Sequence, residues 1–260
     1  MRIVWQKGIN KTFLFLLIVI GFTACEEYNE GCMDANATNY NFAYEKPCCC
    51  VYPRMIFQTP LRLDNANFST SDTLYTDNDE GYLIGEINFI ANEINLTRKD
   101  GSIAQPTDSL IDYLVDSDVM PVKITKINSN GANYLENDSI KQIDFTISSN
   151  TGLNQYQPAD FPVDHVFRDS TLYDFTNNEW RYLYISLRPV GGSTISLSFT
   201  PSELDIPTTI QGSWGKSKGN NLTLLFYLHI DELFKGISLS DPTSTLKAKI
   251  IENFPNALKI

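Results

Sequence analysis

Short runs in which apolar and polar residues alternate constrain the fold of this chain more than any other feature. Ile140–Ser148 places isoleucine and phenylalanine at nearly every second position, and Ile195–Phe199 does the same with isoleucine, leucine and phenylalanine. A period of two puts one face of a strand against a core and the other toward solvent. Clusters of Gly, Asn, Asp and Pro, which are typical of turns, separate the runs. The pattern therefore predicts an all-β chain.

The runs predict an antiparallel β-sandwich of about eight or more strands, because many short strands joined by turns favour that architecture. Sustained helical periodicity is scarce, apart from a turn at Asp231–Phe234, and no repeat of solenoid period occurs. We expect one sandwich domain over residues 54–260. The predicted strands are Met55–Leu63, Gly85–Thr97, Val122–Ile127, Ile140–Ser148, Trp180–Leu187, Thr194–Phe199, Leu222–His229 and Leu246–Ile251.

The first 25 residues carry the pattern of an export signal. Three positive charges precede the apolar run Phe13–Phe22, which ends at Thr23-Ala24-Cys25. The run is shorter than the roughly 20 apolar residues of a spanning helix. Phe22-Thr-Ala-Cys25 resembles a lipobox, which predicts that residues 1–24 are a lipoprotein signal peptide and that lipid is attached to Cys25. The alternative is an ordinary signal peptide with an incidental cysteine.

The charge of the chain limits its partners. Removing residues 1–24 takes away three positive charges and no acid, so the net charge of −11 becomes about −14. Such an acidic surface disfavours nucleic acid and anionic lipid headgroups as partners. Glu26-Glu27 resembles the surface-export signal of some bacterial lipoproteins. We expect a lipid-anchored protein on the outer face of the outer membrane, with the periplasmic face as the alternative and an outer-membrane protein as a further partner.

All five cysteines lie in the first fifth of the chain. With Cys25 lipidated, an even number remains, and in an exported protein this favours disulfides. Three pairings are open at this point. The disulfide candidates are Cys32, Cys48, Cys49 and Cys50.

Residues 25–53 form a unit distinct from the predicted sandwich. Gly31–Asn41 is rich in Asn, Asp and small residues, and it resembles a short cysteine-bracketed module found near the start of many exported proteins. The oxygens of Asp34, Asn36, Asn39 and Asn41 could bind calcium, but turn chemistry explains these residues more simply. We interpret the unit as a disulfide-stapled spacer between the anchor and the sandwich.

Several segments, taken in order, resemble one known family. They are Leu83–Leu96 followed by Asp100-Gly101, then Ile140–Ile147, then Leu172-Tyr173 with Trp180–Ile185, and finally Leu224–Phe234. On these segments the chain is similar to the MbnP-like copper-binding domain family, and the resemblance covers most of residues 55–251. The resemblance implies a β-sandwich and, in some members, copper bound by histidines beside an oxidatively modified tryptophan.

The chain departs from that family where copper would bind. Asp174-Phe175-Thr176 stands where a Trp-x-Trp pattern is usual, and the histidine of the family's Phe-His-Ile-Gly motif has no match. The two histidines of the chain, His165 and His229, are therefore weak metal candidates, and Trp180 is a weak candidate for the modified tryptophan. We expect a degenerate metal site, with a working copper site as the alternative.

No motif in the sequence indicates an enzyme. A Gly-x-Ser-x-Gly elbow and a P-loop lysine pattern are both absent, and the acidic pairs Asp77/Asp79 and Asp116/Asp118 have the surroundings of solvated loops. Gly191-Gly192 and Gly212–Gly215 are expected to mark turns. The predicted function is a non-enzymatic binding or accessory protein, or else a subunit of an outer-membrane assembly.

A short Asp-Ser/Thr-apolar pattern occurs at three places that are expected to be loops. It resembles an O-glycosylation site of some bacterial exported proteins, and surface loops tolerate a bulky glycan. The residues that would carry the glycan are Thr73, Ser109 and Ser139.

Overall fold

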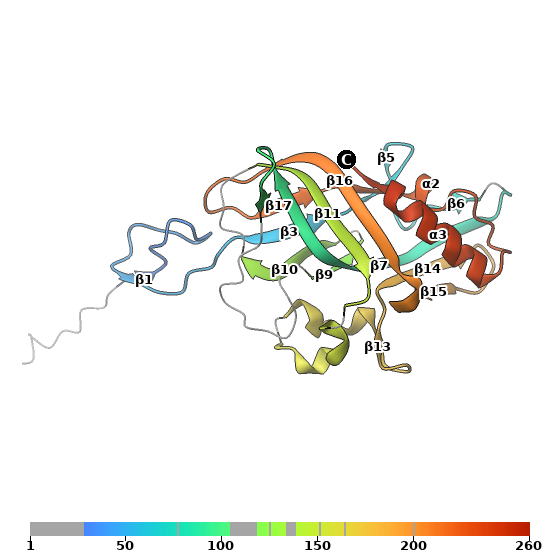
Figure 1. Cartoon of the computed structure of the whole chain (residues 1–260), viewed down its shortest axis with the longest axis horizontal. Helices are drawn as coiled ribbons and strands as arrows, with labels where there is room; N and C mark the ends of the chain where they lie inside the picture. The colour runs from blue at the N-terminus through green and yellow to red at the C-terminus, as the bar shows by residue number, and fades with distance from the viewer. Residues whose placement is uncertain are drawn as a thin grey trace, which may run out of the picture.

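The computed structural model describes residues 29–76, 78–104, 119–124, 126–133, 139–150, 152–163, 165–199 and 201–260. The predictions for the signal peptide, Cys25, Glu26-Glu27, Asp77, Ser109 and the pair Asp116/Asp118 lie outside these residues. In Figure 1 the N-terminal segment projects from one end of a body built of strands, and helix α3 (Thr243–Ala257) lies on the other side of that body. Among the described residues, no helix is both long and apolar enough to cross a membrane.

The body is the predicted all-β sandwich. Its largest sheet follows the order β15-β14-β7-β11-β16, and β6, β8 and β9 also pair with β7. Smaller sheets of order β10-β3-β17 and β19-β18-β4-β5 complete the body. The bounds in the large sheet are β6 Leu74–Tyr75, β7 Gly81–Arg98, β8 Ile103–Ala104, β9 Met120–Lys123, β11 Ser139–Ser148, β14 Leu183–Pro189, β15 Ile195–Phe199 and β16 Asp205–Gly215. Those in the smaller sheets are β3 Arg54–Gln58, β4 Leu61–Leu63, β5 Ala66–Asn67, β10 Ile127–Asn133, β17 Leu222–Leu225, β18 Tyr227–His229 and β19 Leu258–Lys259.

An aromatic core joins the two layers and the helix. Phe89 of β7 stacks on Phe145 of β11 with ring centroids 5.9 Å apart, and it meets Phe254 of α3 edge-on at 5.4 Å. From the smaller sheet, Phe57 of β3 approaches Phe145 at 6.2 Å. These rings are all buried. Burial of large apolar side chains is thus what holds the sandwich together, since its residues include no cysteine.

Strand β7 organises the large sheet by changing partners along its length. Residues from Tyr82 to Phe89 pair with β14, while residues from Asn92 to Arg98 pair with β11. The register shifts at Gly85, where a Cβ would lie 2.8 Å from the Ser186 hydroxyl. A bulge at this glycine therefore lets β7 and β14 pack closely, and bulges of this kind re-aim neighbouring side chains.

The prediction of a strand at Leu246–Ile251 is wrong, although helices are few among the described residues, as expected. The segment lies within α3, whose buried residues Leu246, Ile250, Phe254 and Ala257 recur at helical spacing. Within Leu246–Ile251 alone, apolar and lysine residues alternate, and this period of two favours a strand. The longer period becomes visible when the window reaches Phe254. The predicted turn at Asp231–Phe234 is largely the short helix α2, Ile230–Leu233.

Gly212–Gly215, predicted as a turn, is the end of strand β16. Ile206, Thr208 and Ile210 of this strand are buried in alternation with exposed neighbours. Pro207 is tolerated because β16 is the last strand in the order of the large sheet. At such an edge, the missing N–H of proline does not interrupt hydrogen bonds between central strands. The placement of Ser139 in a loop is also wrong, since it begins β11, whereas Thr73 is exposed in an irregular segment.

Several predicted strands are each two strands with a break. Met55–Leu63 is divided between β3 and β4 at Thr59-Pro60, and Leu222–His229 is divided between β17 and β18 at Phe226. Val122–Ile127 contains the turn between β9 and β10. The predictions for Gly85–Thr97, Ile140–Ser148 and Thr194–Phe199 are confirmed by β7, β11 and β15. The turn at Gly191-Gly192 is confirmed by the Gly192 N–H, which donates to the Pro189 carbonyl at 3.1 Å.

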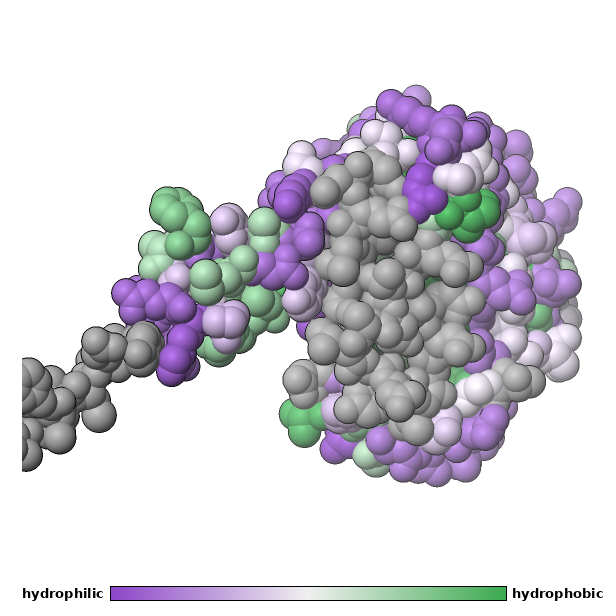
Figure 2. Space-filling view, turned by 60° about the vertical axis from the view of Figure 1, so that its left-hand side comes forward, coloured by the Kyte–Doolittle hydropathy of each residue, from purple (hydrophilic) through white to green (hydrophobic). Residues whose placement is uncertain are grey.

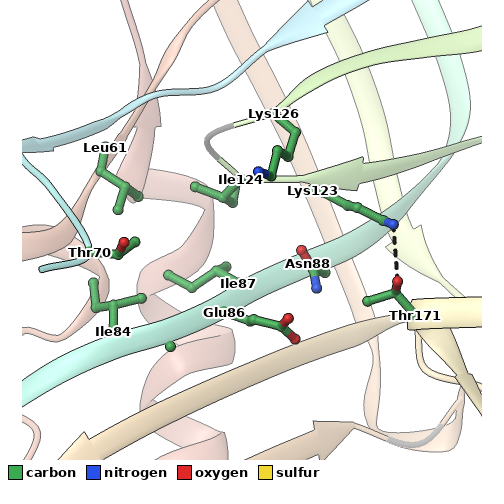
Figure 3. Close-up of a pocket in the computed structure, with 11 residues that line it drawn as sticks. Leu61, Thr70, Ile84, Glu86, Ile87, Asn88, Lys123, Ile124, Lys126 and Thr171 are labelled. Atoms are coloured by element: carbon green, nitrogen blue, oxygen red, sulfur yellow. Dashed lines mark hydrogen bonds between the residues drawn. The ribbon is translucent and has the colours of Figure 1, made fainter.

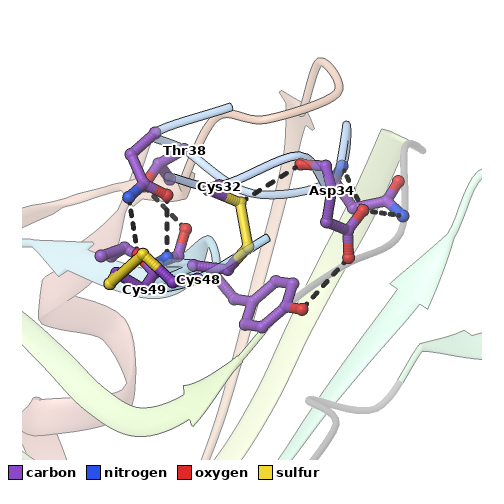
Figure 4. Close-up of a disulfide and its surroundings, with 10 residues drawn as sticks. Cys32, Asp34, Thr38, Cys48 and Cys49 are labelled. Atoms are coloured by element: carbon purple, nitrogen blue, oxygen red, sulfur yellow. Dashed lines mark hydrogen bonds between the residues drawn. A yellow bond between two sulfur atoms is a disulfide. The ribbon is translucent and has the colours of Figure 1, made fainter. Parts of the chain in front are cut away.

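The N-terminal module, residues 29–53, is stapled by two disulfides (Figure 4). Cys32 pairs with Cys50, and Cys48 pairs with its neighbour Cys49. The Asp34 carboxylate accepts hydrogen bonds from the Asn36 backbone at 2.9 Å and from the Tyr52 hydroxyl at 3.1 Å. These contacts confirm turn chemistry for Asp34. The module's only strands are the short parallel pair β1 (Glu30–Gly31) and β2 (Lys46–Pro47) among its described residues.

Candidate functional site

A cleft of about 370 Å³ opens where β7 is left without a partner on one side (Figure 3). On the side away from β14, β6 pairs with Gly81 and Tyr82, and β9 begins to pair at Asn88. In the interval, the described contact on this side is a hydrogen bond from the Ile124 N–H to the Ile87 carbonyl at 3.0 Å. The cleft thus lies over an open interval of the largest sheet.

The lining of the cleft mixes apolar side chains with polar and charged ones. Its residues come from β4, β7, β9 and the turn that follows it, the loop that holds Thr70 and the 3₁₀ turn that holds Thr171. Ile84, Ile87 and Ile124 supply apolar surface, and Glu86 supplies an exposed carboxylate. The full lining is Leu61, Thr70, Ile84, Gly85, Glu86, Ile87, Asn88, Lys123, Ile124, Lys126 and Thr171.

Asn88 is the polar residue that most clearly belongs to the cleft rather than to the fold. Its side chain lies among the lining residues in Figure 3, between Glu86 and Lys123. The residue is only 5% exposed, and its side-chain amide makes no hydrogen bond to another described residue. The amide atoms are not among the fully buried polar atoms, so they open to the cleft. An amide that lines a cleft without a bond to the fold can donate to or accept from a ligand in that cleft.

The wall formed by the β9–β10 turn is held in place by Asn128. The Asn128 amide donates to the carbonyls of Lys123 at 3.0 Å and Lys126 at 3.1 Å, and its oxygen accepts from the Lys123 N–H at 2.8 Å. These three bonds replace strand pairing across the turn. They fix the backbone from which both lysines reach the cleft.

Lys123 is tied to the opposite wall. Its ammonium donates to the Thr171 hydroxyl at 3.0 Å and forms an ion pair with Asp169. Partial burial alone would raise the pKa of Asp169, but hydrogen bonds from Lys123 and Thr171 outweigh it and hold that pKa at about 2. Lys123 is therefore neutralised in place, and Lys126 is the cation that stands exposed at the rim.

Two shallower depressions adjoin the cleft, and Lys126 borders all three. One, of about 300 Å³, is lined by Lys123, His165 and Asp169 among others. The other, of about 180 Å³, lies over the break between β3 and β4. All three depressions lie around the β9–β10 turn, and together they are called the concave surface.

His165 lies in this concave surface, and His229 lies elsewhere. His165 caps the short helix η3 (Val166–Arg168): its Nδ1 accepts from the Phe167 N–H at 3.2 Å, and its ring stacks on Phe161 at 4.8 Å. His229 is buried at the end of β18, and its Nε2 has no hydrogen-bond partner among the described residues. Burial, followed by the positive charge of Lys259, lowers the pKa of His229.

The structure does not bring the two histidines into one metal site. In the part of the chain that the structure describes, no group of three or more His, Cys, Asp or Glu residues could hold a metal ion. Metal binding by either histidine alone stays a prediction.

Trp180, on β13 (Glu179–Trp180), is the centre of a separate aromatic cluster. It meets Phe167 at 5.4 Å and Tyr173, on β12 (Tyr173–Asp174), at 5.1 Å, and its indole N–H donates to the Tyr156 carbonyl at 2.8 Å. The cluster lies in the region of the 3₁₀ turns η1 (Leu153–Gln155), η2 (Pro158–Asp160), η3 and η4 (Ser170–Leu172). One further 3₁₀ turn, η5 (Pro201–Glu203), follows β15. These contacts give Trp180 a packing role in the region that holds Asp169 and Thr171 beside the cleft.

Sequence reasoning missed the cleft because no local motif encodes it. Asn88 and Thr171 are more than 80 positions apart and meet only through the fold. The available signal was an asparagine inside the apolar run of β7, three residues after a glycine that interrupts the run.

Comparisons with known proteins add a distant similarity. No family model matches the chain, and no curated protein matches it. Among solved structures, MbnP from Methylosinus trichosporium is similar with a TM-score of 0.44 and 12% identity, over 72% of this chain and 78% of that chain.

Proposed function

We propose that this chain is a non-enzymatic binding protein of the cell envelope, anchored by lipid on Cys25, that holds a small ligand in the cleft beside Asn88. The amide of Asn88 carries the proposal, because it lines the cleft and no hydrogen bond to another described residue uses its donors and acceptor. The isoleucines of the cleft favour a ligand with an apolar part, and the amide, Glu86 and Lys126 favour one with hydrogen-bonding or charged groups.

A fragment screen observed by NMR tests the cleft. Small molecules that combine an apolar group with an amide, carboxylate or amine are added to isotope-labelled protein, and the Asn88 side-chain NH₂ resonances are followed. We expect hits that shift these resonances and lose about tenfold or more in affinity in Asn88→Leu, because the ligand then lacks its buried hydrogen bond.

Asn95→Leu is the matched control, since Asn95 is an exposed residue of the same strand and its amide donates to the Glu93 carbonyl. Hits that bind both variants as they bind the wild type would contradict a cleft built around Asn88. A thermal unfolding curve for each variant separates lost binding from lost folding.

The anchor requires its own test. Mass spectrometry of the protein extracted from membranes is expected to find acyl chains on Cys25 at a new N-terminus, and Cys25→Ser is expected to release the protein from the membrane. An unmodified Cys25 in membrane-extracted protein would contradict the anchor without affecting the cleft.

A copper-binding lipoprotein is the alternative function, and the position of His165 in the concave surface favours it over other metal proposals. Stoichiometric copper kept by purified, desalted protein and lost on His165→Ala would support it. Metal-free protein after copper exposure would contradict it.

A further inference from the structure

Exposed apolar side chains are concentrated on the N-terminal module. The described residues include eleven large apolar side chains that are exposed, and four of them fall within residues 29–53. Phe42 is the most prominent of the four, with 82% of its surface exposed. In Figure 2, apolar residues gather on the module, which projects from the body. The four are Met33, Tyr40, Phe42 and Val51.

Covalent and hydrogen bonds keep the segments that carry these four residues together. The Asn41 N–H donates to the Cys32 carbonyl at 2.9 Å, which places Met33 and Phe42 on adjoining segments. The Val51 N–H donates to the Asn39 side chain at 2.8 Å, and the Cys32–Cys50 disulfide closes the unit. A stapled segment of this size has no core in which to bury these side chains, so they stay on its surface.

The charges of the module are mostly satisfied within it. Lys46 forms an ion pair with Glu30, and Asp34 is held by Tyr52 and Asn36. Hydrogen bonds, the largest from the Asn36 backbone, keep the pKa of Asp34 below its ordinary value. The apolar residues of the module therefore lie among few unpaired charges, although the chain as a whole is strongly acidic.

The module is also close to the proposed anchor. Three residues separate Cys25 from Asn29, and four residue steps of extended chain span at most about 14 Å. This step rests on the proposed lipidation of Cys25. A lipid on Cys25 would hold the module within reach of the lipid headgroups. No such link holds a second copy of the chain near the module.

We propose that Met33, Tyr40, Phe42 and Val51 form a membrane-docking surface that inserts into the interfacial layer of the bilayer holding the Cys25 lipid. Aromatic and aliphatic side chains stabilise such contacts, and a lipid chain with a second membrane contact holds a protein more firmly than the chain alone. The body would then project from the bilayer at the other end of the module (Figure 1).

Tryptophan quenching tests the docking surface. Mature chains from Cys25 onward that carry Phe42→Trp or Phe175→Trp are coupled through the Cys25 thiol to vesicles of phosphatidylcholine with a maleimide headgroup lipid. Phe175 is the matched control because it is 68% exposed on the body. Brominated acyl chains are expected to quench the indole introduced at position 42 about fivefold more strongly than the one at position 175, because only position 42 enters the lipid. The buried Trp180 and Trp214 give a constant background.

Each result decides between the occupants of the surface. Equal quenching at both positions, with the indole of Phe42→Trp still open to aqueous iodide, would overturn the proposal. Before coupling, the indole of Phe42→Trp could be shielded from iodide, and more so at higher protein concentration. That result would assign the surface to a second copy of the chain and would also overturn the proposal. Because the coupling is chemical, these results do not depend on whether cells acylate Cys25, which mass spectrometry measures separately.

Discussion

The N-terminal module and the sandwich reach stable structures by different physical means. The sandwich buries a continuous apolar core and contains no cysteine, whereas the module buries little beyond Cys32 and Ala37 and carries two disulfides. A short segment cannot bury enough apolar surface to offset its loss of chain entropy, so crosslinks take the place of a core. The comparison teaches that the two regions should respond to different perturbations.

Phe89→Ala is expected to have the largest effect and to act on the sandwich. The Phe89 side chain is fully buried and contacts Phe145 and Phe254, so the substitution removes contacts with both the neighbouring strand β11 and α3. We expect the free energy of unfolding to fall by about 3–5 kcal/mol, the range for a buried phenylalanine. Denaturant unfolding followed by tryptophan fluorescence measures it. An unchanged pattern of proteolysis within residues 29–53 is the control.

The double variant Cys32→Ser/Cys50→Ser is expected to act on the module. The disulfide closes a loop between residues 18 positions apart, and closure of such a loop is worth about 3 kcal/mol to the segment that it restrains. Proteases should cut residues 29–53 much faster, while the unfolding midpoint of the sandwich stays unchanged. Cys48→Ser/Cys49→Ser is the matched control, because that disulfide joins neighbours and closes no long loop. A clear fall in the sandwich midpoint would show that the two regions share their stability.

The sequence predicts the parts of this fold that rest on local alternation. Strands such as β11 and β15 carry a period of two that a single window detects, and the sandwich class follows from their number. Helix α3 was missed because its apolar residues recur over four turns, while a short window around Ile250 favours a strand. Strand β16 was missed although Ile206, Thr208 and Ile210 alternate, because its proline and glycines favour a turn.

The candidate site depends on long-range geometry and was not predictable in the same way. The sequence singled out His165, which does border the concave surface, but it gave no reason to join that residue to Asn88 or Lys126. The open interval of β7 exists only because β6 ends and β9 begins at particular registers. Register of this kind follows from tertiary packing, and no local propensity encodes it.

The ion pair between Lys123 and Asp169 is a third kind of stabilising contact, and we expect its loss to change the unfolding free energy least. Lys123 and Asp169 join the sheet to the aromatic loop region, beside the cleft and far in sequence from the module. The pKa of Asp169 is about 2 in the folded protein, below its ordinary value of 3.8. The pair therefore contributes stability that is fully present above about pH 4 and is lost as the pH falls from about 4 toward 2.

Asp169→Asn should remove this contribution and leave a flatter dependence of unfolding free energy on pH between 4 and 2. The Asp169 side chain is 51% exposed, so solvent screening keeps the expected difference from the wild type below about 1 kcal/mol at neutral pH. Asp205→Asn, at an exposed carboxylate that begins β16, is the control. Urea unfolding at pH 7, 4 and 3 measures all three proteins, and a loss in Asp169→Asn that persisted unchanged at pH 3 would assign the effect to packing. Whether the ion pair or packing causes the fall in unfolding free energy, Asp169→Asn should leave proteolysis of residues 29–53 unaltered. The reason is that no described hydrogen bond or ion pair of Asp169 reaches the module.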